Sequence, residues 1–280
     1  MRLTLRLSER RQKFSQKKSL GQVFLREDWP CRKMVEQLRK HHVQNVIEIG
    51  PGPGILTKLL LEAGINVLAI EKDDRLADRL VDLKKQLDYP GKLEILNQDI
   101  LKFNLEEWVE KNKASKTAVC GNIPYNISSP ILMWLLPHLD SLSLASLMVQ
   151  LEFGERVASS PSTKSYGSLT VYAQLRSKVQ LDFKVPRTAF YPVPKVDSAV
   201  ITLKPLQNKE SDVILKKVEQ VSRKAFSQRR KKLSNSLSAF LKGDQQQDLP
   251  IDLSRRVDTV SPQEFVSLVK SLGLEPDLDV

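Results

Sequence analysis

Short runs of β-branched residues alternate with helical segments along most of this chain, and this alternation limits the fold more than any other feature. A β-rich run over 43–49 precedes a helical segment over 55–63, and a second run over 65–70 precedes a long helical segment over 73–87. Consecutive parallel strands need a crossover connection, which is usually a helix. The pattern therefore predicts an α/β fold, with a parallel sheet covered by helices on both faces.

The same pattern continues and then changes in character near residue 206. No helix separates the last two expected strands, so we expect them to form an antiparallel pair at the sheet edge. Beyond Pro205 the pattern is helical, over 209–241 and 261–273. The further elements expected are strands at 93–96, 117–120, 144–149, 179–185 and 199–203, and helices at 31–40, 105–111, 130–136 and 152–158.

We therefore divide the chain into a basic arm (1–20), a Rossmann-like domain (21–205) and a small helical domain (206–280). At 41% hydrophobic residues the chain can bury a sizeable core. No window approaches eighteen consecutive apolar residues, which excludes a helical membrane span.

Cysteine and histidine usage gives no sign of metal chemistry. Cys31 and Cys120 lie 89 positions apart and have neither redox nor ligand spacing, so two reduced thiols are expected. The three histidines, His41, His42 and His138, form no cluster with them. We expect no metal, and a cytoplasmic location is the default.

A glycine-rich turn ends the first expected strand. It has the sequence Glu48-Ile49-Gly50-Pro51-Gly52-Pro53-Gly54 and leads directly into a helix. The pattern is GxGxG, which is neither the dinucleotide fingerprint GxGxxG nor the nucleoside-triphosphate loop. The carboxylate of Glu48 would disfavour a pyrophosphate and would tolerate a cationic ligand.

Acids follow the ends of the next two expected strands, at Glu71 and Asp99. The carboxyl ends of neighbouring parallel strands line one crevice, so these acids and Glu48 are expected to meet there. Glu71 can accept both hydroxyls of a ribose, and Asp99 can accept the amino group of adenine. Together the three acids predict a site for an adenosine that carries a sulfonium, which is S-adenosylmethionine.

The fourth strand leads into Asn122-Ile123-Pro124-Tyr125, the most specific local signal in the chain. The amino group of adenine is a poor nucleophile, because its lone pair is delocalised into the ring. An Asn side-chain oxygen and a backbone carbonyl can hold the two amino hydrogens in a reactive geometry, and Tyr125 offers a ring for stacking. Later in the chain, Phe190 could stack on the other face of a flipped base and Lys195 could contact phosphate.

The net charge of +11 is concentrated in two clusters. Residues 1–20 carry seven cations and only Glu9 as an acid, and residues 223–232 carry six cations and no acid. Unmixed clusters of one sign favour a polyanionic partner over a solvated face. Membrane attachment is the weaker alternative, and a transit peptide is an alternative for the first cluster.

Several of these segments together resemble the KsgA-type small-subunit ribosomal RNA adenine dimethyltransferases, and the resemblance extends from about residue 14 to 275. The segments that carry it are 18–25 (KSLGQVFL), 48–54 (EIGPGPG), 122–128 (NIPYNIS), 166–167 (YG), 190–200 (FYPVPKVDSAV) and 225–232 (AFSQRRKK). The resemblance implies a Rossmann-like methyltransferase domain with a helical RNA-binding domain. It also implies N6,N6-dimethylation of two adjacent adenosines in the 3′-terminal hairpin of small-subunit rRNA, within an assembling subunit.

The resemblance also assigns roles to residues of this chain. The expected base-holding residues are Asn122, Tyr125 and Phe190, and the expected S-adenosylmethionine contacts are Val23, Leu25, Gly50, Glu71, Asp99 and Asn122. Three positions depart from the family pattern: Val23 replaces an Asn, Ser168 an Arg and Leu151 a Lys. A contact at Val23 must therefore be made by its backbone, while the other two changes bear on RNA docking.

Three alternatives remain at this point. The Erm-type enzymes share the same core but modify large-subunit rRNA, and the helical tail AFSQRRKKLSNSL favours the small-subunit enzymes. A DNA adenine methyltransferase would more often have a different Asn or Asp motif and a separate base-reading domain. A non-catalytic nucleic-acid-binding module is disfavoured by the intact glycine turn, Glu71, Asp99 and the Asn122 turn. We expect a monomer.

Overall fold

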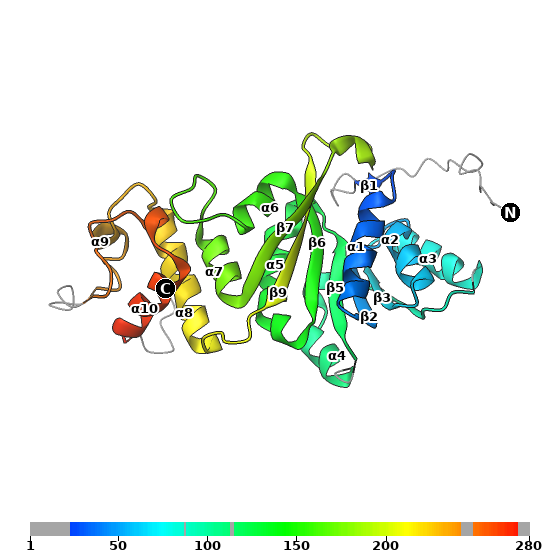
Figure 1. Ribbon diagram of the computed structural model, residues 1–280, viewed down its shortest axis with the longest axis horizontal. Coiled ribbons are helices and arrows are strands. Elements are labelled where there is room, and N and C mark those ends of the chain that lie inside the picture. Colours follow the sequence, from blue (N-terminus) through cyan, green and yellow to red (C-terminus); the bar gives the residue numbers. More distant parts are fainter. Residues whose placement is uncertain (1–22, 87, 113–114, 242–248, 274–280) are drawn as a thin grey trace.

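A seven-stranded sheet forms the centre of the computed structural model, which describes residues 23–86, 88–112, 115–241 and 249–273. The expected basic arm over 1–20 lies outside the described residues. The sheet has the order β4-β3-β2-β5-β6-β9-β7, and a separate two-stranded ribbon joins β1 to β8 (Figure 1). The strands are β1 (Phe24–Leu25), β2 (Asn45–Ile49), β3 (Asn66–Glu71), β4 (Leu93–Asn97), β5 (Thr117–Asn122), β6 (Leu144–Gln150), β7 (Ser177–Val185), β8 (Phe190–Tyr191) and β9 (Ser198–Pro205).

The strand directions confirm the predicted α/β fold. Strands β4, β3, β2, β5 and β6 are parallel to one another. Strand β9 is antiparallel to both β6 and β7, so the predicted antiparallel pair is present and β7 forms the sheet edge. The chain runs from β2 outward to β3 and β4 and then returns to the other side of β2 with β5. Ligands of such sheets bind at this switch point, outside the carboxyl ends of the two diverging strands.

Helices cover both faces of the sheet. Helices α1, α2 and α3 pack on one face around a core that includes Leu38 and Leu60, and α4 to α7 pack on the other around Leu132 and Leu147. The helices are α1 (Trp29–Lys40), α2 (Ile55–Glu62), α3 (Asp74–Gln86), α4 (Leu105–Lys111), α5 (Ser128–Leu135), α6 (Leu151–Val157) and α7 (Ser168–Arg176). All but α7 were predicted to within about three residues at each end.

The C-terminal part is helical, as predicted, and has a core of its own. It contains α8 (Asp212–Ser227), α9 (Leu233–Ser236) and α10 (Pro262–Ser271). The expected helical stretch over 209–241 is interrupted between α8 and α9, where the cations Arg229 to Lys232 lie in turns. The core of this helical part also includes Tyr166, Val171 and Leu175, which precede residue 206 in the sequence. The proposed boundary at 206 therefore stays a prediction.

Short 3₁₀ helices complete the fold, at Ile100–Lys102, Tyr125–Ile127, Leu136–Ser141, Arg187–Ala189 and Val257–Thr259. Two of them follow directly on strand ends that carry predicted site residues. Within the described residues, no helix combines the length and the apolar character that a membrane span requires.

Candidate functional site

A cavity of about 210 Å³ lies at the switch point of the sheet, where the carboxyl ends of β2 and β5 diverge. It brings together eight of the residues that the sequence singled out, from five separate segments. These residues are Val23, Leu25, Glu48, Gly50, Glu71, Asp99, Asn122 and Tyr125. The predicted meeting of strand-end residues is therefore present, while the roles assigned to them remain predictions.

The glycine turn between β2 and α2 forms one wall of the cavity. Gly50 and Gly52 have φ angles of +59° and +58°, which disfavour any other residue. A Cβ on Gly52 would lie 3.2 Å from the ring of Phe24, so the turn and this ring are in close contact. At Gly50, by contrast, a Cβ would meet nothing within 4 Å, so the backbone of the turn is open to a ligand at that residue.

Glu71, at the end of β3, has its carboxylate fixed by two backbone groups. Its Oε2 accepts from the Gly52 N–H at 3.1 Å, and its Oε1 accepts from the Asp73 N–H at 2.9 Å. The side chain is 5% exposed, and burial raises the pKa of Glu71 although both backbone hydrogen bonds oppose the shift. Each carboxylate oxygen keeps a second lone pair with which it can accept a hydroxyl group.

Glu48 lies deeper, at 1% exposure. The Thr57 hydroxyl donates to its Oε2 at 2.7 Å. Burial raises the pKa of Glu48 to about 8, and the nearby Glu71 adds to the shift. Near neutral pH this carboxyl is therefore largely protonated, and a cation in the cavity would favour its ionised form.

Asp99 follows β4 and is paired with a lysine that the sequence analysis did not consider. Lys72 Nζ lies 2.8 Å from Asp99 Oδ2, and the Leu101 N–H donates to Oδ1 at 3.1 Å. The Lys72 contact holds the pKa of Asp99 below its usual range, so this carboxylate is charged. Lys72 lies next to Glu71 in sequence, but nothing in the pattern predicts that its side chain reaches Asp99.

Asn122 ends β5 with its side chain at the cavity. Its Nδ2 donates to the Val23 carbonyl at 3.0 Å, which orients the amide because only the nitrogen can donate. This contact within the protein uses the backbone of Val23 and leaves the Asn122 side-chain oxygen as an acceptor. The expected contact of Val23 with the cofactor stays a prediction.

Tyr125 begins the 3₁₀ helix after this turn. Its hydroxyl lies 2.8 Å from Ser198 Oγ, at the start of β9, and burial raises the pKa of Tyr125. Pro124 lies in the turn between Asn122 and Tyr125. Its carbonyl accepts from the Ile127 N–H at 3.1 Å and from the Ser128 hydroxyl at 3.3 Å.

Phe190 is the predicted site residue that does not line the cavity. It is 1% exposed and packs in the core that contains α1 and α2. Its neighbour in the ribbon is Leu25, which does line the cavity. Stacking of Phe190 on a base would require the ribbon to move, and this role stays a prediction. Lys195 is exposed in the loop before β9.

Several cavity residues were missed by the sequence analysis. Phe24 lies against the glycine turn, and Lys72 lies against Asp99. Met34 of α1 and Met148 of β6 supply apolar surface. These side chains follow ordinary core spacing within their elements, so their place at the cavity depends on packing and carries no local signal. Of the two cysteines, both of them buried, Cys31 reaches the cavity.

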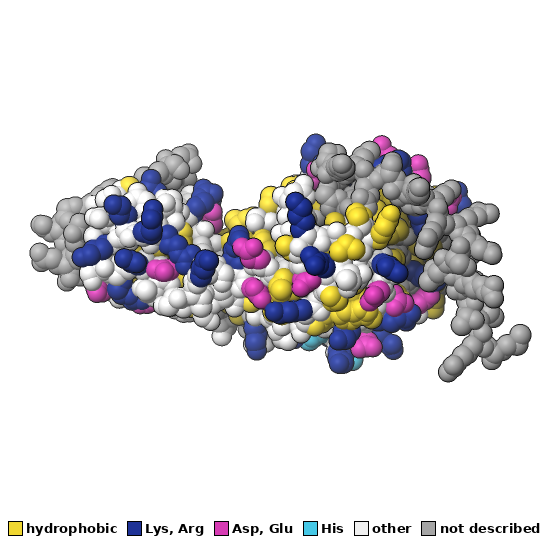
Figure 2. Space-filling view, turned by 90° about the horizontal axis from the view of Figure 1, so that it is seen from above, with side chains coloured by type: hydrophobic (Ala, Val, Ile, Leu, Met, Phe, Trp, Pro, Cys, Tyr) yellow, Lys and Arg dark blue, Asp and Glu magenta, His cyan; other side chains and the backbone are white. Residues whose placement is uncertain are grey.

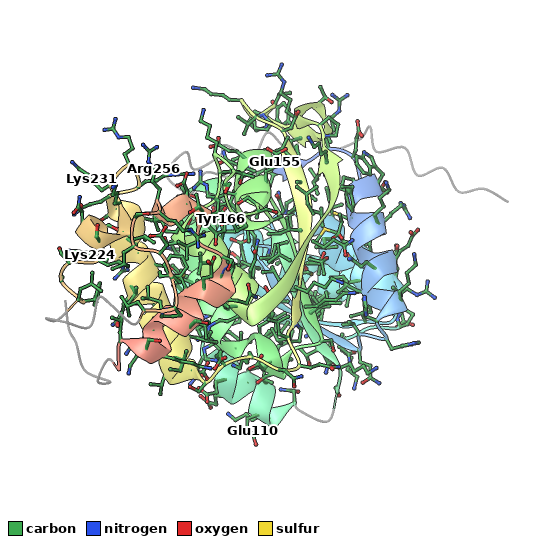
Figure 3. All side chains as sticks on the ribbon, turned by 60° about the vertical axis from the view of Figure 1, so that its left-hand side comes forward. Glu110, Glu155, Tyr166, Lys224, Lys231 and Arg256 are labelled. Carbon is green, nitrogen blue, oxygen red and sulfur yellow. The ribbon has the colours of Figure 1, made fainter. Side chains whose placement is uncertain are left out.

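The basic cluster 223–232 lies on the helical part, where Lys224, Lys231 and Arg256 project outward (Figure 3). Arg229 differs from its neighbours, because its guanidinium donates to the carbonyls of Thr163 at 2.9 Å and Lys164 at 2.8 Å. Arg229 therefore fixes a loop of the sheet domain and is not a free cation.

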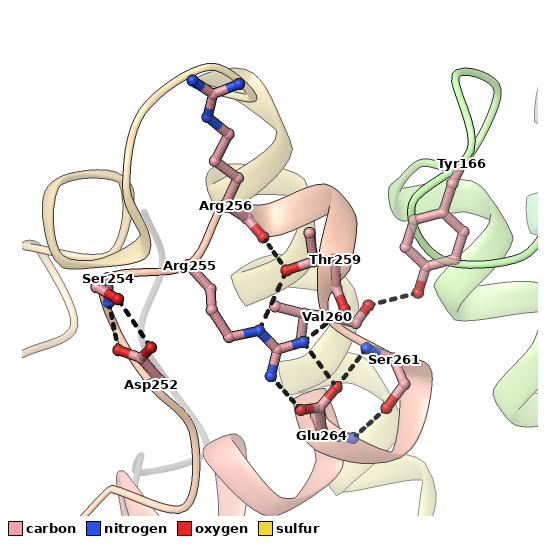
Figure 4. Close-up of polar contacts among 9 residues, drawn as sticks. All are labelled: Tyr166, Asp252, Ser254, Arg255, Arg256, Thr259, Val260, Ser261 and Glu264. Carbon is pink, nitrogen blue, oxygen red and sulfur yellow. Dashed lines mark hydrogen bonds and ion pairs between the residues drawn. The ribbon is translucent and has the colours of Figure 1, made fainter.

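A second contact ties the same loop to the helical part. The buried Tyr166 hydroxyl donates to the Val260 carbonyl at 2.8 Å, just before α10 (Figure 4). Arg255 pairs with Glu264 in the first turn of that helix, and Ser261 and Glu264 form a capping box. The basic surface is thus held rigidly against the domain that contains the cavity.

The parallel sheet, the glycine turn at its switch point and the Asn122 turn beside it are the features of a Rossmann-like methyltransferase. Among the described residues, no group of three or more His, Cys, Asp or Glu side chains could hold a metal ion. Comparison with known proteins narrows this class. The family model described as Ribosomal RNA adenine dimethylase matches residues 13–273, and the chain belongs to this family.

Individual relatives agree with the family. Ribosomal RNA small subunit methyltransferase A of Francisella tularensis subsp. novicida is 40% identical over 261 residues, covering 92% of this chain and 97% of that protein. A dimethyladenosine transferase from Plasmodium falciparum superposes with a TM-score of 0.70 at 24% identity, covering 88% of this chain and 95% of that structure. The 23S rRNA methyltransferase ErmE superposes with a TM-score of 0.65 at 27% identity, covering 90% of this chain and 100% of that structure. The protein is thus a methyltransferase.

Proposed function

We propose that this protein transfers methyl groups from S-adenosylmethionine to the N6 atoms of two adjacent adenosines in the 3′-terminal hairpin of small-subunit rRNA. The proposal rests on one observation above all: the Asn122 side chain, oriented by Val23, faces the same cavity as the glycine turn. The choice of RNA rests on the 40% identity to proteins named for the small subunit. We place the reaction in subunit maturation, with a monomeric, cytoplasmic enzyme and the assembling subunit as its partner.

The residues around the cavity fit S-adenosylmethionine. The open backbone at Gly50 can receive part of the adenosine, and the fixed carboxylate of Glu71 can accept two ribose hydroxyls. Asp99 can accept an amino group at the adenine edge. Glu48, buried beside Glu71, would be ionised by a nearby cation, which is the charge that a sulfonium carries.

When bound, the cofactor supplies an electrophilic methyl group, and the protein prepares the nucleophile. The side-chain oxygen of Asn122 accepts one amino hydrogen of the target adenine. Because the Pro124 carbonyl already accepts two hydrogen bonds, the Ile123 carbonyl is the better second acceptor. Both contacts reduce the conjugation of the amine with the ring and direct its lone pair toward the position of the methyl group. As the new N–C bond forms, the bond between the methyl carbon and the sulfonium sulfur would break and the donor would leave as a neutral thioether. The amine nitrogen thereby gains a positive charge, becomes acidic and loses a proton to water.

Modification of large-subunit rRNA is the alternative, since ErmE superposes over its full length. The two functions separate in one experiment. Tritiated S-adenosylmethionine is supplied to small subunits that lack these methyl groups and, in parallel, to large subunits. We expect label in the small-subunit rRNA. Label confined to large-subunit rRNA would replace this proposal with the Erm-type function, and failure to bind the cofactor would leave only a binding role.

A further inference from the structure

A projecting loop beside the cavity exposes an unusual amount of apolar surface. Six large hydrophobic side chains are exposed among the described residues, and three of them lie within residues 191–196. Tyr191 is 69% exposed, Val193 58% and Val196 44%. Figure 2 looks down on the face from which this loop rises and shows hydrophobic side chains gathered there among lysines and arginines. Apolar groups concentrated in this way indicate a binding surface more often than chance exposure does.

The loop is held in a defined position at both ends. At its start, β8 pairs with β1, and the Arg26 N–H donates to the Ala189 carbonyl at 2.7 Å. At its end, the Arg187 N–H donates to Asp197 Oδ1 at 2.9 Å. The Ser198 hydroxyl lies 2.8 Å from the hydroxyl of Tyr125, which follows the Asn122 turn. Pro192 and Pro194 restrict the backbone between these anchors. The exposed side chains are thus presented on a fixed support.

The ribbon register places Tyr191 beside Phe24, one of the residues that line the cavity. Tyr191 is paired directly with Phe24, and directly paired residues project from the same face of a β ribbon. The Phe24 ring lines the cavity and packs on the glycine turn. Phe190, paired with Leu25, projects from the opposite face into the core. Both faces of the ribbon thus reach the cavity, through Phe24 and Leu25, and the exposed Tyr191 lies next to Phe24 at its edge.

The charge around this ring favours a nucleic-acid occupant. Arg26, Arg187 and Lys195 are exposed around the loop. The acids on the same segments have partners within the protein: Asp197 accepts from the Arg187 backbone, Glu27 accepts from the Trp29 indole, and Asp28 pairs with Arg32. An aromatic ring between cations is the arrangement that binds unpaired nucleotides, in which the base stacks and the phosphate meets the charge. A protein partner would find less complementarity in a surface of this charge.

We propose that Tyr191 is a stacking platform for the base next to the target adenosine. This inference rests on the proposed function, because it presupposes an RNA substrate in the cavity. Stacking here fixes the strand on one side of the target while the Asn122 turn holds the target itself. Tyr191 is therefore a positioning residue that acts on RNA binding and leaves the chemical step unchanged.

The test compares Tyr191→Ala and Tyr191→Phe on small subunits that lack the methyl groups, with Val213→Ala as a control for loss of an exposed hydrophobic side chain. We expect Tyr191→Ala to raise KM for the subunit about fivefold to tenfold, which is the lower end of the effect expected when one stacked base is lost. The kcat value should stay within about twofold of the wild type. Tyr191→Phe and Val213→Ala should resemble the wild type. An unchanged KM in Tyr191→Ala, or an equal loss in Tyr191→Phe, would overturn the proposal.

A second measurement separates the loss of a stacking contact from a general defect of the variant. Subunits are reconstituted with ligated rRNA that carries an abasic nucleotide on the 5′ or the 3′ side of the target. One of these substrates should raise the wild-type KM as much as Tyr191→Ala does, and should abolish any further effect of that substitution. An undiminished effect of Tyr191→Ala on both abasic substrates would point to a protein contact and overturn the proposal. If the wild type labels only large-subunit rRNA, the proposed function fails, and the same variants on that RNA still test Tyr191.

Discussion

At the scale of single residues, the site depends on contacts that orient polar side chains. Asn122 is useful as an acceptor only because the Val23 carbonyl takes its nitrogen. Glu71 is held by backbone N–H groups from two different segments. The motif predicted which residues gather at the cavity. It could not predict these orientations, because the partner of Asn122 lies 99 residues away along the chain and Gly52 lies 19 residues from Glu71.

Replacement of Asn122 by Ala should remove an acceptor that acts on the reacting amine. Preorganised polar groups of this kind lower barriers by about 2–4 kcal/mol, so kcat should fall roughly 30- to 1,000-fold. Single-turnover transfer measures the loss, and filter binding to subunits should give an affinity close to that of the wild type. A variant with normal turnover would refute the role of Asn122.

The raised pKa of Glu48 predicts a specific dependence of stability on pH. Because its pKa is about 8 in the folded protein and near 4.5 when exposed, the folded state holds the proton more tightly. The contribution of Glu48 to the free energy of unfolding is therefore fully present below pH 4.5 and declines as pH rises toward 8. Glu48→Gln keeps the hydrogen bond from Thr57 and removes the titration.

Denaturant unfolding at pH 5, 6.5 and 8 checks this expectation. The free energy of unfolding of the wild type should fall more steeply across this range than that of Glu48→Gln. Parallel pH profiles for the two proteins would show that Glu48 is ionised in the folded state at all three values.

At the scale of elements, the sequence predicts those whose pattern is set locally. The parallel strands and α1 to α6 follow from β-branched runs and amphipathic spacing. Helix α7 was missed because it packs against two cores, with Tyr172 in one and Val171 in the other, and so it has no polar face. The β1–β8 ribbon was missed because each strand has two residues and is defined only by a partner far away in sequence.

Close approach of β2 and β5 gives a prediction at this scale. A Cβ on Gly121 would lie 2.4 Å from the Ile49 carbonyl oxygen, so Gly121→Ala should force the strands apart at the crevice. We expect a loss of about 1–3 kcal/mol in stability, as for an overpacked core, together with weaker binding of S-adenosylmethionine.

Gly167→Ala is the matched control, because a Cβ there meets nothing within 4 Å and the backbone is extended. Its melting temperature and cofactor affinity should stay close to the wild-type values. Equal effects of the two substitutions would mean that the crevice does not depend on the spacing of these strands.

At the scale of the whole molecule, the basic helical part and the cavity are held in one arrangement. Arg229 connects the loop after α6 to the turn that follows α8, and Tyr166 connects the same loop to the segment before α10. This connection bears on the basic cluster 223–232, whose cations favour a polyanionic partner. Four of these cations lie between Arg229 and Lys232. With Arg229 bound to protein carbonyls, three remain.

Neutralising Arg230, Lys231 and Lys232 together should flatten the salt dependence of RNA binding. Three phosphate contacts correspond to a decrease of about 2–3 in the slope of log affinity against log salt. The control replaces Lys84, Lys85 and Lys111, on α3 and α4, and should leave the slope unchanged. A slope that is insensitive to the first set would place this cluster away from the RNA.

The central claim is the dimethylation of two adjacent adenosines in small-subunit rRNA. Its most direct test is to incubate the protein with S-adenosylmethionine and small subunits that lack these methyl groups, isolate the 3′-terminal fragment and determine its modified nucleosides by mass spectrometry. The account predicts two N6,N6-dimethyladenosines at neighbouring positions in that fragment. An unmodified fragment, with methylated adenosine appearing only in large-subunit rRNA treated in the same way, would contradict it.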